Sequence, residues 1–70
     1  MNIFGDYRQA IRDYSRAIEL DPKDALAYRN RGNAYAKIGD HRQALEDQKN
    51  AARLGDRQLQ DLFRREGIDW

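Results

Sequence analysis

The chain has 70 residues, of which 36% are charged, a formal net charge of +1 at pH 7, and no cysteine. Its length limits it to one domain with a thin core. The lack of cysteine excludes disulfides, thiolate metal sites and cysteine nucleophiles, and we expect neither a cofactor nor a metal ion. Acidic and basic residues are mixed along the chain, so no basic block predicts binding to nucleic acid.

No apolar run approaches the roughly 20 residues of a membrane span. The first four residues have neither the cationic end nor the apolar run of a signal peptide. With the lack of cysteine, these features predict a cytoplasmic protein that does not bind membranes.

Apolar residues at three- and four-residue spacing predict a first helix over residues 6–20. Pro22 ends it, because proline lacks a backbone N–H and disfavours helix in the residue before it. Asp24 is expected to cap a second helix that runs to about Ile38, where Gly39 takes the left-handed conformation that ends a helix.

The third helix is predicted from Asp40, as its cap, to Leu54, and a fourth from about Arg57 to Glu66. Gly67 is a natural stop for the fourth helix. Ile68 is then placed to fold back on its last turn.

An internal repeat is the strongest feature of the sequence, and its period is the separation between Gly5 and Gly39. Residues 5–11 (GDYRQAI) align with residues 39–45 (GDHRQAL), and Ala17 and Leu20 align with Ala51 and Leu54. A fixed period of this length predicts helix pairs that stack on one another, because a single pair cannot bury its own apolar faces.

The chain resembles the tetratricopeptide repeat family over nearly its whole length. It departs from the family pattern at Gln48, where a large apolar residue is usual, and at Asp56, where a proline usually closes the repeat. The matching residues are Tyr28, Gly32, Tyr35, Ala44 and Ala51 in the complete repeat, and Ala10, Tyr14, Ala17 and Pro22 in the partial one.

The resemblance implies an all-α fold, a right-handed stack of antiparallel helix pairs in one unit over residues 1–70. Residues 6–20 would be the second helix of a partial repeat, 24–55 a full repeat, and 57–67 a C-terminal capping helix. Gly32 and Ala44 are small, as expected where two helices cross at about 8–10 Å.

No catalytic constellation is visible, and we predict that the chain is not an enzyme. His41 is the only histidine and Ser15 the only serine. His41 is expected to pack on the neighbouring helix, and Ser15 lies in mid-helix with no sign of a nucleophile elbow.

The predicted function is non-catalytic binding of a peptide or of another helical surface. Arg29, Asn33 and Lys37 are four residues apart on one helix, where they could hold a carboxylate and an extended backbone. Some chaperone-binding family members hold a terminal carboxylate with Lys and Asn at the spacing of Arg29 and Asn33, but they use three such helices. The resemblance implies an inward, concave face made of Leu26, Arg29, Asn30, Asn33, Ala36 and Lys37.

A second periodic pattern pairs cations with anions. Asp13 and Asp47 are one repeat period apart, and so are Arg31 and Arg65. We hypothesise that Arg31 pairs with Asp13, and Arg65 with Asp47, with both carboxylates half-buried.

Two alternatives remain open. The chain could self-associate in two-fold pairs through the apolar face of its first helix, unless residues 1–5 fold back as a lid. It could also bind RNA as pentatricopeptide arrays do, although the length of the repeat period and the near-neutral charge speak against this. The self-association face consists of Ile3, Phe4, Tyr7, Ile11, Tyr14 and Ile18.

Overall fold

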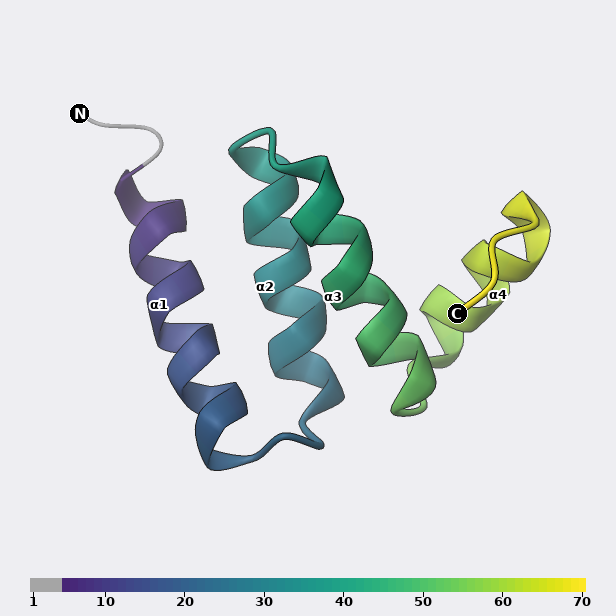
Figure 1. Ribbon diagram of the computed structural model, residues 1–70, viewed down its shortest axis with the longest axis horizontal. Helices are drawn as coiled ribbons and strands as arrows, with labels where there is room; N and C mark the ends of the chain where they lie inside the picture. The colour runs from purple at the N-terminus through teal and green to yellow at the C-terminus, as the bar shows by residue number, and fades with distance from the viewer. Residues whose placement is uncertain (1–4) are drawn as a thin grey trace.

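The computed structural model describes residues 5–70, which form four helices: α1 (Gly5–Leu20), α2 (Ala25–Lys37), α3 (His41–Arg53) and α4 (Arg57–Glu66). Each helix packs on the next one along the chain. Helix α2 runs antiparallel to both α1 and α3 (Figure 1). The principal-axis extents are 38 × 26 × 16 Å, which describes a thin slab. The predicted all-α fold is confirmed for these residues.

An aspartate caps each of the last three helices. The side chains of Asp24, Asp40 and Asp56 accept hydrogen bonds from backbone N–H groups three residues later, at 3.2, 3.3 and 3.1 Å. Gly39 lies in the turn between α2 and α3 and has a φ of 85°, a value that glycine adopts without steric cost. The predicted caps at Asp24 and Asp40, and the turn at Gly39, are confirmed.

Helices α2 and α3 come very close to each other where they cross at Gly32. A Cβ atom added to Gly32 would lie 3.0 Å from the Ala44 carbonyl oxygen and 3.2 Å from Asp47 Cβ. Ala44 itself is buried. The expectation that small residues allow this crossing is therefore confirmed.

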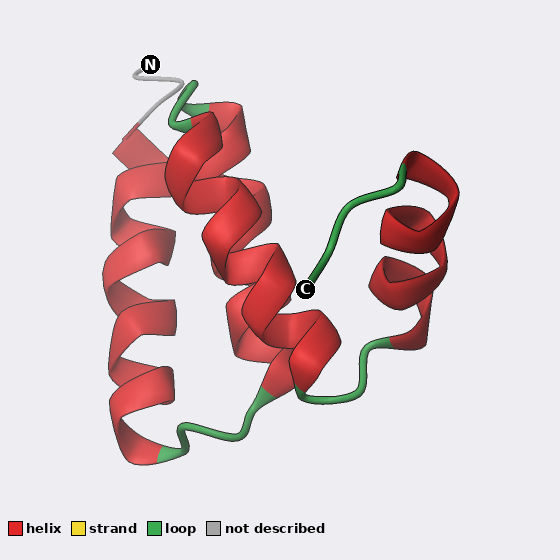
Figure 2. Cartoon of the chain, turned by 45° about the vertical axis from the view of Figure 1, so that its right-hand side comes forward, coloured by secondary structure: helices red, strands yellow, loops and turns green. Residues whose placement is uncertain are grey.

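The main hydrophobic cluster lies between α3 and α4. It consists of Ala51, Ala52, Leu59 and Phe63, with Tyr28 and Ile68 packed against it. Ile68 N–H donates to the Phe63 carbonyl at 2.8 Å beyond the left-handed Gly67, so the predicted fold-back is confirmed. Figure 2 shows the segment after α4 running back toward α3.

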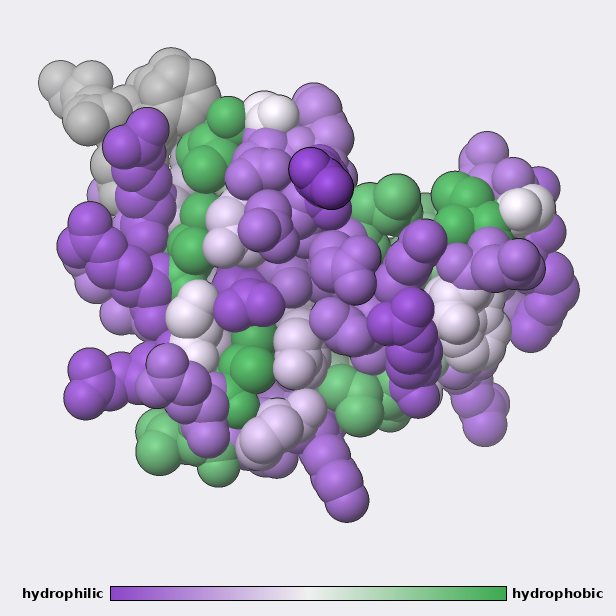
Figure 3. Space-filling view, in the orientation of Figure 1, coloured by the Kyte–Doolittle hydropathy of each residue, from purple (hydrophilic) through white to green (hydrophobic). Residues whose placement is uncertain are grey.

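The face seen in Figure 3 is mainly polar, and on it hydrophobic residues form a band along the seam between α1 and α2. None of the described helices is both long enough and apolar enough to cross a membrane.

Candidate functional site: the groove between α1 and α2

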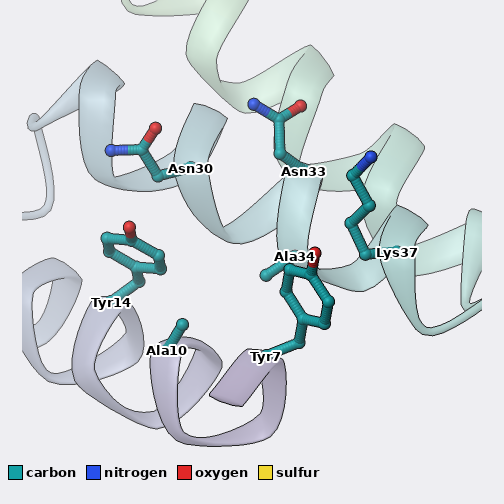
Figure 4. A pocket seen from close by; sticks show the side chains of 7 residues that line it. All are labelled: Tyr7, Ala10, Tyr14, Asn30, Asn33, Ala34 and Lys37. Atoms are coloured by element: carbon teal, nitrogen blue, oxygen red, sulfur yellow. The ribbon is translucent and has the colours of Figure 1, made fainter. Parts of the chain in front are cut away.

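An open groove of about 220 Å³ separates α1 from α2 (Figure 4). Tyr7, Ala10 and Tyr14 form the α1 wall, and Asn30, Asn33, Ala34 and Lys37 form the α2 wall. The Tyr14 ring extends from α1 toward Asn30, and the Tyr7 ring lies below Lys37 (Figure 4). The lining therefore combines two aromatic rings, two amides and one cation.

Three of the six residues predicted for the concave, peptide-binding face lie in this groove, and Ala36 is not among its lining residues. Asn30, Asn33 and Lys37 line it, and Leu26 continues their stripe along α2 with 62% of its surface exposed. Arg29 lies elsewhere, because its Nη1 donates to Asp56 Oδ2 at 3.3 Å. The stripe that reaches the groove thus runs through Leu26, Asn30, Asn33 and Lys37, at three- and four-residue spacing.

The α1 wall was predicted from sequence for a different role. Tyr7 and Tyr14 were assigned to self-association together with Ile11 and Ile18, and all four are partly exposed. Ile3 and Phe4 lie outside the described residues. Sequence reasoning missed the fact that the tyrosines and the α2 amides share one groove. The spacing of Tyr7, Ala10 and Tyr14 places them on one helical face, but it does not place that face opposite the α2 amides.

The predicted pairing of Arg31 with Asp13 is wrong. Arg31 instead forms a bidentate pair with Asp47, with Nη2 to Oδ1 at 2.7 Å and Nε to Oδ2 at 2.8 Å. The close crossing at Gly32 brings α2 against the helix that follows it, so Arg31 reaches forward to α3. Asp13 is exposed and accepts only from Gln9 Nε2 at 3.2 Å among the described side chains.

The predicted pairing of Arg65 with Asp47 is also wrong. Both Asp47 oxygens are taken by Arg31, and Arg65 lies exposed on α4. Asp47 is 2% exposed, which is more deeply buried than the expected half-buried carboxylate, whereas Asp13 is exposed.

Arg31 joins three helices. Besides Asp47 on α3, its Nη1 donates to Ser15 Oγ on α1 at 3.0 Å. The rings of Tyr28 and Tyr35 lie 5.7 and 5.9 Å from its guanidinium carbon, within the range of cation–π attraction. The hydrogen bond to Asp47 raises the pKa of Arg31, against the lowering effect of burial, so Arg31 stays charged at any pH below arginine's ordinary pKa.

No group of side chains in the described part of the chain points to catalysis. His41 is exposed, which differs from the expected packing on a neighbouring helix. It is the first residue of α3 and follows the exposed turn at Gly39 and Asp40. Ser15 is occupied by Arg31. Within residues 5–70, no three His, Cys, Asp or Glu side chains are arranged to hold a metal ion.

Comparison with known proteins agrees with the repeat geometry. A family profile described as "TPR repeat" matches residues 4–39, and one described as "Tetratricopeptide repeat" matches residues 25–54. The chain belongs to the tetratricopeptide repeat family. Such repeats are protein-interaction modules.

Several curated proteins resemble this tetratricopeptide repeat chain. Small glutamine-rich tetratricopeptide repeat-containing protein 2 of Mycosarcoma maydis is 41% identical over 70% of the chain, which covers 14% of that protein. Serine/threonine-protein phosphatase 5 of Homo sapiens is 40% identical over 86% of the chain, which covers 12% of the phosphatase. Hsp70-Hsp90 organizing protein 2 of Arabidopsis thaliana is 33% identical over 91% of the chain, which covers 11% of that protein.

The chain therefore spans about an eighth of the length of these relatives. No solved structure matches it at a comparable level of significance.

Proposed function

We propose that this chain is a non-catalytic protein-interaction module whose α1–α2 groove binds an extended peptide with a free carboxylate. The observation that carries the proposal is the groove lining. Asn30 and Asn33 offer amides along α2, Lys37 offers a cation, and Tyr7 and Tyr14 face them from α1.

Each kind of lining group matches one part of such a peptide. An asparagine amide can donate to a backbone carbonyl and accept from a backbone N–H. The Lys37 ammonium can form a charge-assisted hydrogen bond with a carboxylate. The tyrosine rings can cover an apolar side chain. The name of the Arabidopsis relative, an Hsp70-Hsp90 organizing protein, supports a protein as the partner.

The expected affinity is modest, because one helix supplies all three polar groups. We expect a dissociation constant of about 10–100 μM, equivalent to about 5.5–7 kcal/mol. Arg29 does not add to the site, because Asp56 holds it at the α3–α4 junction.

The test is a calorimetric titration with acidic peptides, each prepared with a free and an amidated C-terminus. We expect amidation and Lys37→Ala each to weaken binding by about threefold or more. Lys23→Ala is the matched control, since Lys23 is exposed in the turn between α1 and α2 and does not line the groove. Equal binding of free and amidated peptides would rule out a carboxylate site.

A further inference from the structure

The helices α1 and α3 occupy the same repeat position but are covered differently. On α3, helix α2 lies over Ala44, Asp47 and Gln48 at the Gly32 crossing. Their equivalents one repeat earlier are Ala10, Asp13 and Tyr14. Ala10 and Tyr14 line the open groove, and Asp13 is exposed. This face of α1 therefore has the same repeat positions as the face of α3 that α2 covers.

The described part of the chain also contains an arginine and an aspartate that match the Arg31–Asp47 pair by repeat position. Arg65 is the repeat equivalent of Arg31, and Asp13 is the equivalent of Asp47. In the described chain the ion pairs are Arg31–Asp47, Arg29–Asp56 and Arg64–Asp61, so neither Arg65 nor Asp13 has an ionic partner. The two residues lie on opposite end helices, α4 and α1.

We propose that a second copy of this chain docks its α4 on the open side of α1, with Arg65 of one copy paired to Asp13 of the next. The register is set by the repeat. Suppose that the second copy continues the repeat pattern of the first, so that its residues are counted on by two full repeat periods. Its Asp13 then stands in the same repeat relation to Arg65 of the first copy as Asp47 does to Arg31 within one copy. The contact then repeats the α2–α3 pair between two molecules.

The docking helix departs from α2 at one important position. Glu66 stands where α2 has Gly32, at the point where an added Cβ already meets α3 atoms at 3.0–3.2 Å. Glu66 would also lie near the carboxylate of Asp13, which it repels. The association is therefore weak in the wild-type chain, and removing the Glu66 side chain strengthens it.

This contact differs from a two-fold pairing of α1 with α1. It joins two different surfaces, so each added copy leaves one of each surface free and growth continues beyond a dimer. The inference goes beyond the proposed peptide site, because it depends on Asp13 and Arg65, and the peptide site depends on Lys37. A peptide in the groove would compete with the second copy for Ala10 and Tyr14.

The experiment is sedimentation of the full chain from about 10 μM to 1 mM, in the wild type and in a Glu66→Ala background, a range in which weak association of this kind becomes measurable. We expect the average mass to rise with concentration beyond twice 8.2 kDa, with Glu66→Ala shifting the rise to lower concentration. Asp13→Arg and Arg65→Asp should each weaken association by about tenfold. The double reversal Asp13→Arg/Arg65→Asp should restore it to within about threefold of its background.

Glu46→Arg and Arg42→Asp are the matched controls, because they make the same charge changes at exposed positions of α3 and should leave association unchanged. Helix content by circular dichroism confirms that each variant folds. A chain that remains at 8.2 kDa in both backgrounds would overturn the proposal, even if a peptide with the α2 sequence binds the groove. Loss of association with Asp13→Arg but not Arg65→Asp would also overturn it, in favour of two-fold pairing through α1.

Discussion

The helices α1 and α3 share a repeat position, and residues 5–11 and 39–45 are nearly the same, yet the aspartates of the two helices have opposite surroundings. Asp47 on α3 is 2% exposed and holds Arg31 with both oxygens. Asp13 on α1 is exposed, and its hydrogen-bond donor is Gln9 of the same helix. In a stack of helices, the burial of a residue therefore depends on whether the preceding helix covers it, not on the sequence of its own helix.

The same difference separates a structural interaction from a free surface. On α3 the covered face holds a charged pair with two hydrogen bonds and two neighbouring tyrosine rings. On α1 the equivalent face is one wall of the groove. Substitutions at matched positions of the two helices should therefore have very different effects.

The largest expected effect is at the buried pair. Asp47→Ala leaves the Arg31 guanidinium, whose side chain is only 20% exposed, without its carboxylate, and we expect a loss of about 3–5 kcal/mol in the free energy of unfolding. Asp13→Ala, the matched control on α1, should cost less than about 0.5 kcal/mol in dilute solution. Urea denaturation followed by circular dichroism measures both. Similar losses from the two substitutions would contradict the comparison.

A smaller effect is expected at the crossing of α2 and α3. Gly32→Ala places a Cβ 3.0 Å from the Ala44 carbonyl oxygen, and we expect a loss of about 1–3 kcal/mol. Helix propensity alone would change stability in the opposite direction, because alanine favours a helix by about 0.5–1 kcal/mol over glycine. Asn33→Ala, at the next and exposed position, is the control and should be nearly neutral. A Gly32→Ala variant more stable than wild type would show that the helices can separate freely.

The sequence was sufficient to predict the helices, the turns and the small residues at the crossing, because each follows from local rules. The cap at Asp40, the turn at Gly39 and the crossing at Gly32 depend on neighbours close in the chain or on the repeat. The partner of Arg31 could not be predicted in this way. Asp13 and Asp47 have the same repeat position, and only the packing of α2 against α3 decides between them.

The composition of the groove was predicted in part for the same reason. Asn30, Asn33 and Lys37 could be placed on one face of α2 by spacing, and Tyr7 and Tyr14 on one face of α1. Their meeting depends on the angle between the two helices, which spacing does not contain. Arg29 was assigned to the same face by its four-residue spacing from Asn33, and its ion pair with Asp56 was missed because Asp56 lies 27 residues away in sequence.

The turn that leads into α2 differs from the turn that leads into α4. Pro22 precedes α2, and its repeat equivalent before α4 is Asp56. Proline limits the backbone of the turn, whereas Asp56 caps α4 through Leu59 N–H and also pairs with Arg29. Both helices therefore begin at an aspartate cap, but before α2 the proline and the cap are separate residues, whereas Asp56 alone provides the cap of α4 and an ion pair.

We expect the smallest effects at this junction, and they should separate the two roles of Asp56. Asp56→Ala removes both the cap and the ion pair and should cost about 1–2 kcal/mol. Arg29→Ala removes only the ion pair, in which Arg29 is 37% exposed, and should cost less than about 1 kcal/mol. Asp56→Asn keeps a capping oxygen and loses the charge, so its stability should lie close to that of Arg29→Ala.

Urea denaturation at low and at about 1 M salt checks the assignment: salt should reduce the Arg29→Ala loss and leave most of the Asp56→Ala loss in place. Equal losses for Arg29→Ala and Asp56→Ala would instead mean that the ion pair, and not the cap, defines the start of α4.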